Sequence, residues 1–287
     1  MQTTSRADYG YLRQLVFAFS QNVLDPSRDA LFETRLSRLL RQQGMTHLHQ
    51  LVHHLRTRKD AALERTVAET MLTRETSFFR DGRPFDLLRA DLLPRLIEQR
   101  RAARALRFWS AACSTGQEAY SLAILLRKDF PSLADWNIRI EGTDLSAEAV
   151  ARARIGRYHR IEINRGLPAR LVTRYFDHEG EEFAVKPQLS ALCSFRPANL
   201  CASPLPFHEP FDIIFLRNVM LYFAQGTRRT LLTHIHRLLA PDGFLFLGSS
   251  EQPADPSLWT PVLAGGTCYF TPRERSQGAS GVRGVSS

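Results

Sequence analysis

The stretch that decides the fold is Arg107 to Leu126, RFWSAACSTGQEAYSLAILL. It begins as a short apolar strand, continues as a loop of small residues from Ser110 to Gly116, and ends as an amphipathic helix. A second strand-like run, Asn137 to Gly142, follows and leads into Asp144. A strand, a glycine turn, a helix and a strand that ends in a carboxylate form the order of a nucleoside-binding α/β unit. We therefore expect the loop to lie against a ligand and Asp144 to accept hydrogen bonds from a ribose.

The same loop excludes other cofactors. A dinucleotide fingerprint, G-x-G-x-x-G, places bare backbone against a pyrophosphate, but Gly116 stands alone here. A Walker-type G-x-x-x-x-G-K-[ST] motif is also missing from the sequence. A nucleoside cofactor without phosphates fits better, and S-adenosylmethionine is the predicted ligand. An ordinary packing turn between strand and helix is the alternative interpretation of this glycine.

Composition predicts a folded protein with an unusual charge. The 287 residues are 44% hydrophobic and 23% charged, which supports a packed core. No apolar run reaches the length of a transmembrane helix, and the first residues do not resemble a secretory signal, so we expect a cytoplasmic protein without membrane insertion. The net charge is +9 and comes almost entirely from Arg. Acidic protein surfaces and nucleic acid are the candidate partners, and a solvated Arg-rich surface is the alternative.

The cysteines do not predict a metal site. The chain has four of them, and none forms a C-x-x-C pair. His49 and His53 are an i, i+4 pair, but without a C-x-x-C partner such a pair is typical of a solvated helix face rather than a metal site. We therefore expect reduced thiols and no bound metal.

Apolar spacing divides the chain into three parts. Residues 1–70 carry helical periodicity only and are predicted to form an all-α N-terminal domain. Residues 71–83, MLTRETSFFRDGR, are predicted to form a linker. Because a free connector would expose the large rings of Phe78 and Phe79, we expect this linker to dock on the next domain. Residues 84–272 alternate between strands and helices, which indicates a mostly parallel sheet.

Individual strands can be predicted within the α/β part. The expected strands are 106–110, 138–143, 211–216, 243–248 and 267–271. Two shorter runs, 183–185 and 192–195, favour a small antiparallel β-subdomain at about 176–196. The tail, 273–287, is rich in Gly, Ser and Arg, and we expect it to be disordered.

Five segments in order resemble the CheR family, the S-adenosylmethionine-dependent methyltransferases that modify glutamates of chemotaxis receptors. The segments are TRETSFFRDG, FWSAACSTGQEAYS, GTDLSAEAVARARIGRY, FDIIFLRNVMLYF and LAPDGFLFLGSSE. The resemblance covers about residues 10 to 272. It implies a Rossmann-like methyltransferase sheet with a small antiparallel β-subdomain, preceded by an all-α N-terminal domain. It also implies S-adenosylmethionine as cofactor, S-adenosylhomocysteine as product and no metal.

The resemblance implies roles for particular residues. Tyr222 and Arg80 are the implied catalytic residues, with Arg80 pairing with the cofactor's carboxylate. The implied cofactor-binding residues are Thr76, Arg80, Glu118, Asp144, Asn199, Leu200, Arg217 and Asn218. Each role has a structural alternative: Glu118 and Arg80 as a surface ion pair, Tyr222 as a core aromatic, and Asp144 as the N-cap of a following helix.

Three arginines on one predicted helix form the candidate partner surface. Arg35, Arg38 and Arg41 fall on one side of that helix. Because receptor methylation helices are acidic, the resemblance implies that this face binds them. A solvated helix face is the alternative.

The sequence departs from the family pattern at two places, so two family properties are not expected of this chain. Arg74 stands where family members commonly have a cofactor-contacting Asn, so no ligand role is given to Arg74. The segment Phe176 to Val185 is short compared with members that bind a receptor's C-terminal peptide tether, so we do not expect tether binding. Nothing in the sequence requires more than a monomer.

The expected function is transfer of a methyl group from S-adenosylmethionine to glutamate carboxylates of a chemoreceptor. The glutamate is already ionised at pH 7, so no general base is needed. A catalytically silent module that binds the cofactor or its product is the alternative. A nucleic-acid amino-methyltransferase is disfavoured, because Arg217-Asn218-Val219-Met220 replaces the expected N/D-P-P-Y step. We expect no nucleic-acid partner.

Overall fold

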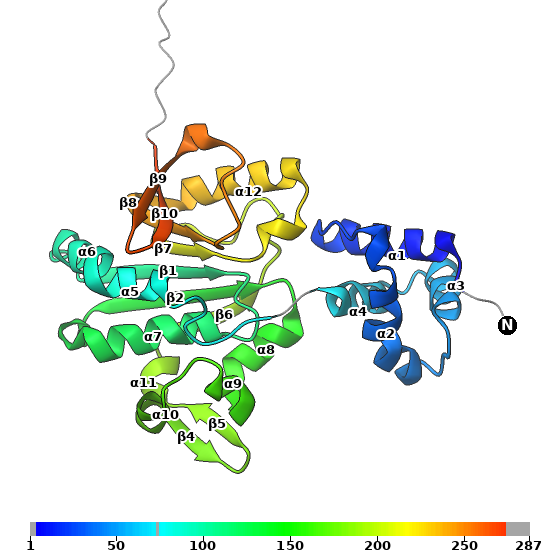
Figure 1. The fold of residues 1–287 in the computed structure, drawn as a ribbon, viewed down its shortest axis with the longest axis horizontal. Helices are drawn as coiled ribbons and strands as arrows, with labels where there is room; N and C mark the ends of the chain where they lie inside the picture. Colours follow the sequence, from blue (N-terminus) through cyan, green and yellow to red (C-terminus); the bar gives the residue numbers. More distant parts are fainter. Residues whose placement is uncertain (1–3, 73–74, 274–287) are drawn as a thin grey trace, which may run out of the picture.

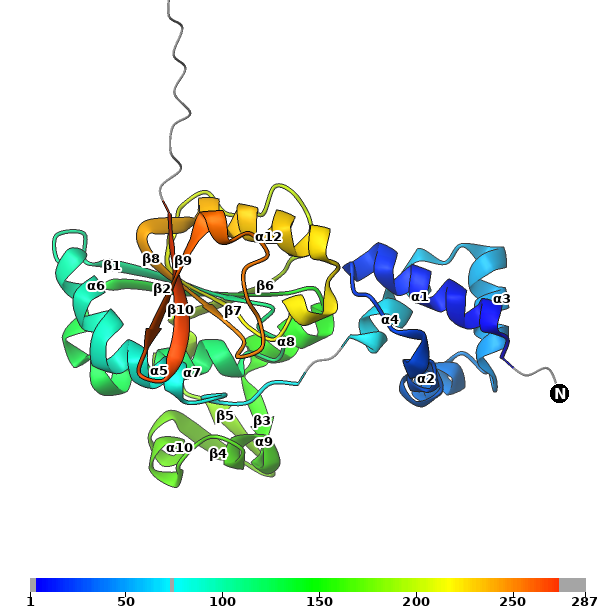
Figure 2. The ribbon, with the colours of Figure 1, turned by 45° about the horizontal axis from the view of Figure 1, so that its top comes forward.

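A computed structural model describes residues 4–72 and 75–273, and it divides them into a helical module and an α/β part (Figure 1). The helical module lies at one end of the α/β part in both views (Figures 1 and 2). Its helices are α1 (Arg6–Ser20), α2 (Ala30–Gln42), α3 (Leu48–Arg58) and α4 (Ala61–Met71). They enclose a separate apolar core that includes Leu12, Phe32 and Leu51.

Local signals fix the ends of α1. Ser5 and Asp8 form a capping box, in which each side chain accepts a hydrogen bond from the other residue's backbone N–H. The helix ends at Ser20, and the left-handed backbone of the next residue, Gln21 (φ 60°), turns the chain toward the α/β part. The next residues, Asn22 and Val23, contact that part directly.

The α/β part is built on a seven-stranded sheet with the order β6-β2-β1-β7-β8-β10-β9. Its strands are β1 (Ala105–Ala111), β2 (Asn137–Asp144), β6 (Cys193–Pro197), β7 (Phe211–Leu216), β8 (Leu239–Leu247), β9 (Trp259–Ala264) and β10 (Thr267–Pro272). The first five strands in the order run parallel, and β10 is antiparallel to both of its neighbours. The five predicted strands are confirmed, and so is the mostly parallel sheet.

Both faces of the sheet are buried. Phe108 and Trp109 are neighbours in β1, yet they enter different cores, as alternation along a strand requires. The core on the Phe108 side includes residues of α6 (Leu93–Gln99), α7 (Gln117–Asp129) and α8 (Ala147–Ile155). The core on the Trp109 side is covered by α12 (Gln225–Leu238). Two covered faces explain why β7, at the middle of the sheet, is buried along its whole length and is apolar except for Asp212.

The remaining helices and turns are short. They are η1 (Pro26–Arg28), α5 (Arg83–Leu87), η2 (Leu88–Leu92), η3 (Pro131–Leu133), α9 (Arg160–Asn164), α10 (Ala169–Tyr175), α11 (Pro187–Ser190), η4 (Met220–Tyr222) and η5 (Pro256–Leu258). None of the described helices is both long and apolar enough to span a bilayer.

A second, three-stranded antiparallel sheet forms the β-subdomain. Its order is β3-β5-β4, with β3 (Arg157–His159), β4 (Phe176–Glu179) and β5 (Glu182–Val185). The small antiparallel sheet is confirmed, but its predicted extent of 176–196 is wrong. The run 192–195 belongs to β6, which pairs in parallel with β2 in the large sheet. The physical reason is that Phe195 packs on Gly142 of β2, whose missing side chain leaves room for the ring.

The linker docks on the α/β part, as the paired phenylalanines predict. Phe78 is 1% exposed and makes edge contacts with Tyr158 and Phe176. Phe79 packs in the same way against Phe85. Arg74 and the predicted tail from residue 274 onward lie outside the described residues.

We predict that Gly142→Ala destabilises the α/β part. A Cβ atom at this position would lie 2.4 Å from Cδ1 of Phe195 and 3.2 Å from Sγ of Cys113. Overpacking of this kind costs about 1–3 kcal/mol in the free energy of unfolding. Urea denaturation followed by circular dichroism measures the change. The matched control is Gly226→Ala, since a Cβ atom there meets nothing within 4 Å, and equal stability of the two variants would contradict the prediction.

Candidate active site

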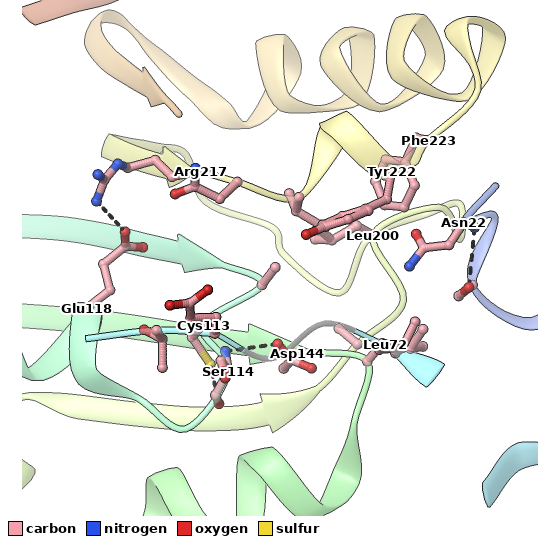
Figure 3. Close-up of a pocket in the computed structure, with 18 of the residues that line it drawn as sticks. Asn22, Leu72, Cys113, Ser114, Glu118, Asp144, Leu200, Arg217, Tyr222 and Phe223 are labelled. Carbon is pink, nitrogen blue, oxygen red and sulfur yellow. Dashed lines mark hydrogen bonds and ion pairs between the residues drawn. The ribbon is translucent and has the colours of Figure 1, made fainter. Parts of the chain in front are cut away.

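A cleft of about 940 Å³, including its open mouth, lies at the carboxyl ends of β1, β2 and β7 (Figure 3). The chain leaves β1 toward β2 on one side and returns to β7 on the other, so this is the topological switch point of the sheet. Ligands of open α/β sheets bind at such points. The lining comes from the end of α1, the linker, and the loops that follow β1, β2, β6 and β7.

The loop after β1 exposes its backbone to the cleft. Ala112 and Ser114 both have left-handed backbones (φ 63° and 50°), and they line the cleft together with Cys113. Gly116 does not line it. A Cβ atom there would lie 2.9 Å from Cβ of Ala153 in α8, so this glycine permits close helix packing. Residues 112–114 are therefore the part of the loop that we expect to lie against a ligand. Gly116 fits the alternative interpretation, an ordinary packing turn between strand and helix.

Asp144 joins the loops after β1 and β2. Its Oδ2 accepts a hydrogen bond from the backbone N–H of Ser114 at 2.9 Å, and its Oδ1 accepts one from that of Ser146 at 2.9 Å. The N-cap of α8 is Ser146, whose Oγ accepts from the N–H of Ala149. Asp144 is thus not the N-cap of this helix, and it lines the cleft with its carboxylate held by two backbone amides.

The buried Arg217 and the half-buried Glu118 form an ion pair at one end of the cleft. Oε2 of Glu118 lies 3.0 Å from Nη1 of Arg217, and Oε1 accepts a hydrogen bond from Ser110 at 2.7 Å. The Arg217 side chain is 2% exposed and also donates to Asp81 and to the carbonyl of Arg80. The surface ion pair between Glu118 and Arg80 is therefore wrong, because Glu118 pairs with Arg217. Since Arg217 has three partners within the chain, it acts on the site by holding Glu118 and the linker.

Arg80 and Thr76 bring the linker into the cleft lining. Arg80 is half-buried, and its Nη1 donates to the carbonyl of Glu75 at 2.9 Å. Within the described residues its guanidinium makes no ion pair. The neighbours Phe79 and Asp81 have left-handed backbones (φ 47° and 65°), which fixes the direction of this segment. A cation with donors to spare at the cleft suits a carboxylate ligand.

The loop after β7 depends on Glu251, which sequence reasoning missed. The Glu251 carboxylate accepts hydrogen bonds from the backbone N–H groups of Gly248 (2.7 Å), Asn218 (2.7 Å) and Leu221 (3.2 Å). It thereby positions Asn218 and the turn that carries Tyr222, both of which line the cleft. The only signal in the sequence was the place of Glu251 at the end of the fifth segment, LAPDGFLFLGSSE.

Asn199 and Leu200 line the cleft from the loop after β6. The Asn199 carboxamide is engaged within the chain: Oδ1 accepts from the N–H of Cys201 at 2.9 Å, and Nδ2 donates to the carbonyl of Phe19 at 3.3 Å. Leu200 is buried and forms an apolar wall. The position of Asn199 is as predicted for a cleft residue, but its side chain joins the two parts of the molecule.

The three candidate partner-binding arginines lie outside the cleft lining. Nη1 of Arg35 donates to the carbonyl of Met71 at the end of α4, and this residue is half-buried. Arg38 and Arg41 are exposed on α2. Arg35 therefore has a structural partner, and the accessible charge of this face comes from the other two.

Cys113 is unsuited to nucleophilic chemistry although it lines the cleft. Burial raises the pKa of its thiol well above the ordinary value, and the nearby carboxylates of Asp144 and Glu118 act in the same direction. The thiol therefore stays protonated at neutral pH. Among the described residues no group of three or more His, Cys, Asp or Glu side chains could hold a metal ion.

We predict that Glu251→Gln lowers the free energy of unfolding by about 2 kcal/mol. The substitution replaces one of the two acceptor oxygens with an amide donor that would face backbone N–H groups, and charge-assisted hydrogen bonds of this kind are the strong ones. Chemical denaturation measures the loss. Glu181→Gln, at an exposed position in the turn between β4 and β5, is the control, and a similar stability for both variants would refute the role of Glu251.

Comparison with known proteins places this chain in a family. A family model described as "CheR methyltransferase, SAM binding domain" matches residues 74–263. "Chemotaxis protein methyltransferase 1" of Pseudomonas aeruginosa is 37% identical over 253 residues, covering 87% of this chain and 91% of the relative. "Chemotaxis protein methyltransferase Cher2" of Pseudomonas putida is 35% identical over 87% of this chain and 91% of the relative. "Chemotaxis protein methyltransferase" of Escherichia coli is 36% identical over 86% and 85%. The chain belongs to the CheR family of S-adenosylmethionine-dependent methyltransferases.

Proposed function

We propose that this enzyme transfers the methyl group of S-adenosylmethionine to glutamate side chains of a chemoreceptor, giving glutamyl methyl esters and S-adenosylhomocysteine. The relatives named above are chemotaxis protein methyltransferases. The observation that carries the proposal is the composition of the cleft at the switch point, where Arg80, Glu118 and Asp144 line one continuous space.

These three side chains match the polar groups of the cofactor. Arg80 is a cation at the cleft and suits the carboxylate of the methionine part. Glu118 is an anion at the same end and suits the ammonium group. Asp144 suits the ribose diol, since a carboxylate accepts from two hydroxyl groups. Thr76 is assigned to the methionine end, and Leu200 is assigned to a wall against the adenine.

Further roles follow from the contacts within the chain. Arg217 is assigned a positioning role, because its guanidinium is engaged by Glu118, Asp81 and the Arg80 carbonyl. Asn218 has a buried Oδ1 with no partner among the described residues, which fits a contact with a bound molecule. Asn199 is assigned to the adenine end through its backbone and the loop it holds.

The bound cofactor supplies a methyl group on a sulfonium, which is an activated leaving group. The protein therefore has to bind and orient the reactants rather than remove a proton. A glutamate has an ordinary pKa of about 4.3 and is ionised at neutral pH. Well-oriented proximity can lower a barrier by about 7–11 kcal/mol, and we assign this orienting role to Tyr222 and Arg80.

The partner side of the proposal concerns the helical module. Exposed Arg38 and Arg41 would attract the acidic methylation helices of a receptor. We further propose that the enzyme acts in the cytoplasm as a monomer. We also propose that it binds no receptor tether, since β4 and β5 of the subdomain have only four residues each.

Methyl transfer tests the proposal. The full-length enzyme with methyl-labelled S-adenosylmethionine and receptor-containing membranes is expected to label the receptor, and mild base is expected to release the label as methanol. Base-stable label would point to an amine or thiol acceptor and would overturn the proposal. Binding of S-adenosylhomocysteine without any labelling would favour the silent module.

Two variants connect that activity to the cleft. Arg80→Ala and Asp144→Ala are expected to weaken the calorimetric affinity for S-adenosylhomocysteine at least tenfold, because each removes a charged or charge-assisted contact. Arg139→Ala, an exposed change at the opposite end of β2, is the control. Unchanged affinity in both cleft variants would place the cofactor elsewhere.

A charge reversal tests the partner surface. The double variant Arg38→Glu, Arg41→Glu is expected to raise the KM for receptor about tenfold at low salt with little change in kcat, because rim charges act mainly on association. Added salt is expected to shrink the difference. The control is the double variant Arg101→Glu, Arg139→Glu, which changes two exposed arginines outside the helical module and has the same net charge. If this control variant shows the same loss, net charge rather than the α2 face is responsible.

A further inference from the structure

One polar group in the cleft, unpartnered within the described part of the chain, comes from the helical module. Asn22 follows the end of α1 and lines the cleft beside Tyr222 and Phe223. Its Oδ1 is buried and has no hydrogen-bond partner among the described residues. Buried amide groups are nearly always paired in folded proteins, so an unpaired carboxamide at the wall of a ligand cleft indicates that its partner is a ligand.

The backbone of Asn22 is held firmly in place. It forms an antiparallel bridge with Phe223, and the N–H of the next residue, Val23, donates to the carbonyl of Tyr222 at 2.8 Å. The N–H of Asn22 donates to Oγ of Ser20 at 3.2 Å. The side chain is therefore presented to the cleft from a fixed backbone rather than from a mobile loop.

The place of Asn22 in the cleft indicates which part of the cofactor it faces. Figure 3 shows Glu118 and Arg217 at one end, Asp144 between, and Asn22 at the other end with Leu72 and Leu200. With the methionine part at the charged end and the ribose on Asp144, the base lies beside Asn22, Leu72 and Leu200. Apolar walls with a small number of polar groups that fix orientation are typical of sites for small molecules.

The competing carboxamide at this end is already engaged. Asn199 uses Oδ1 and Nδ2 in contacts with Cys201 and Phe19, whereas the Asn22 carboxamide has no such contact among the described residues. A carboxamide offers an acceptor and a donor side by side, which matches the amino group of adenine and the ring nitrogen next to it.

We propose that Asn22 binds the adenine of the cofactor, with Oδ1 accepting from the 6-amino group and Nδ2 donating to a ring nitrogen. This inference rests on the proposed function. The helical module then takes part in cofactor recognition as well as in partner binding, and the bound nucleoside bridges the two parts of the molecule.

Calorimetry with two ligands tests the proposal. One ligand is S-adenosylhomocysteine, and the other is the same compound with unsubstituted purine in place of adenine, so that only the 6-amino group is missing. The native enzyme is expected to bind the purine compound about tenfold more weakly, since sites built to hydrogen-bond a group reject the analogue that lacks it. Asn22→Ala is expected to lose about tenfold in affinity for the adenine compound and to bind both ligands about equally.

The controls separate the possible failures. Asn137→Ala changes an exposed asparagine at the start of β2 and is expected to keep the native preference between the two ligands. Unchanged adenine affinity in Asn22→Ala, or an equal loss for both ligands, would overturn the proposal. So would an altered KM for receptor with unaltered ligand affinity, which would assign Asn22 to the acceptor. If the native enzyme binds neither ligand, the proposed function fails rather than this inference.

Discussion

The site depends on one buried guanidinium. Arg217 stands at the end of β7, where it binds Glu118 of α7 on one side and the linker, through Asp81 and the carbonyl of Arg80, on the other. A buried charge is tolerated only when it is paired and hydrogen-bonded. The strand, the helix and the linker are therefore held at fixed distances from one another, and the direction of Arg80 follows from that arrangement.

Two carboxylates hold the loops around the cleft in a similar way, by binding backbone amides. Asp144 binds the backbone amides of Ser114 and Ser146, and Glu251 binds three amides around the loop after β7. Several loop residues have left-handed backbones, which side-chain sterics disfavour. Acceptors that satisfy the backbone N–H groups stabilise these conformations. These contacts within the chain hold the loops around the cleft in place, which is what catalysis by orientation requires.

Local sequence patterns predicted the helices and strands, but contacts between distant residues decided how the strands pair and how the loops of the cleft are held. The strand 106–110 and the helix after Gly116 are visible as apolar periodicity, because each depends on neighbouring residues. Which sheet the run 192–195 joins depends on Phe195 packing over Gly142, about fifty residues away in sequence, which no local pattern contains. Asp144 could be predicted because it ends a strand. Glu251 could not, since two of the three amides that it binds, those of Asn218 and Leu221, lie thirty or more residues away in the sequence.

The bridge between the end of α1 and the loop after β7 has an evolutionary consequence. Val23 and Tyr222 share a main-chain hydrogen bond, and Asn22 pairs with Phe223 across the boundary between the two parts. One wall of the cleft is therefore built by residues 22–23 together with residues 222–223, two segments that lie far apart in the sequence. A chimaera that exchanges only the helical module between relatives would combine residues 22–23 of one protein with residues 222–223 of another. These two segments are therefore expected to have changed together during divergence.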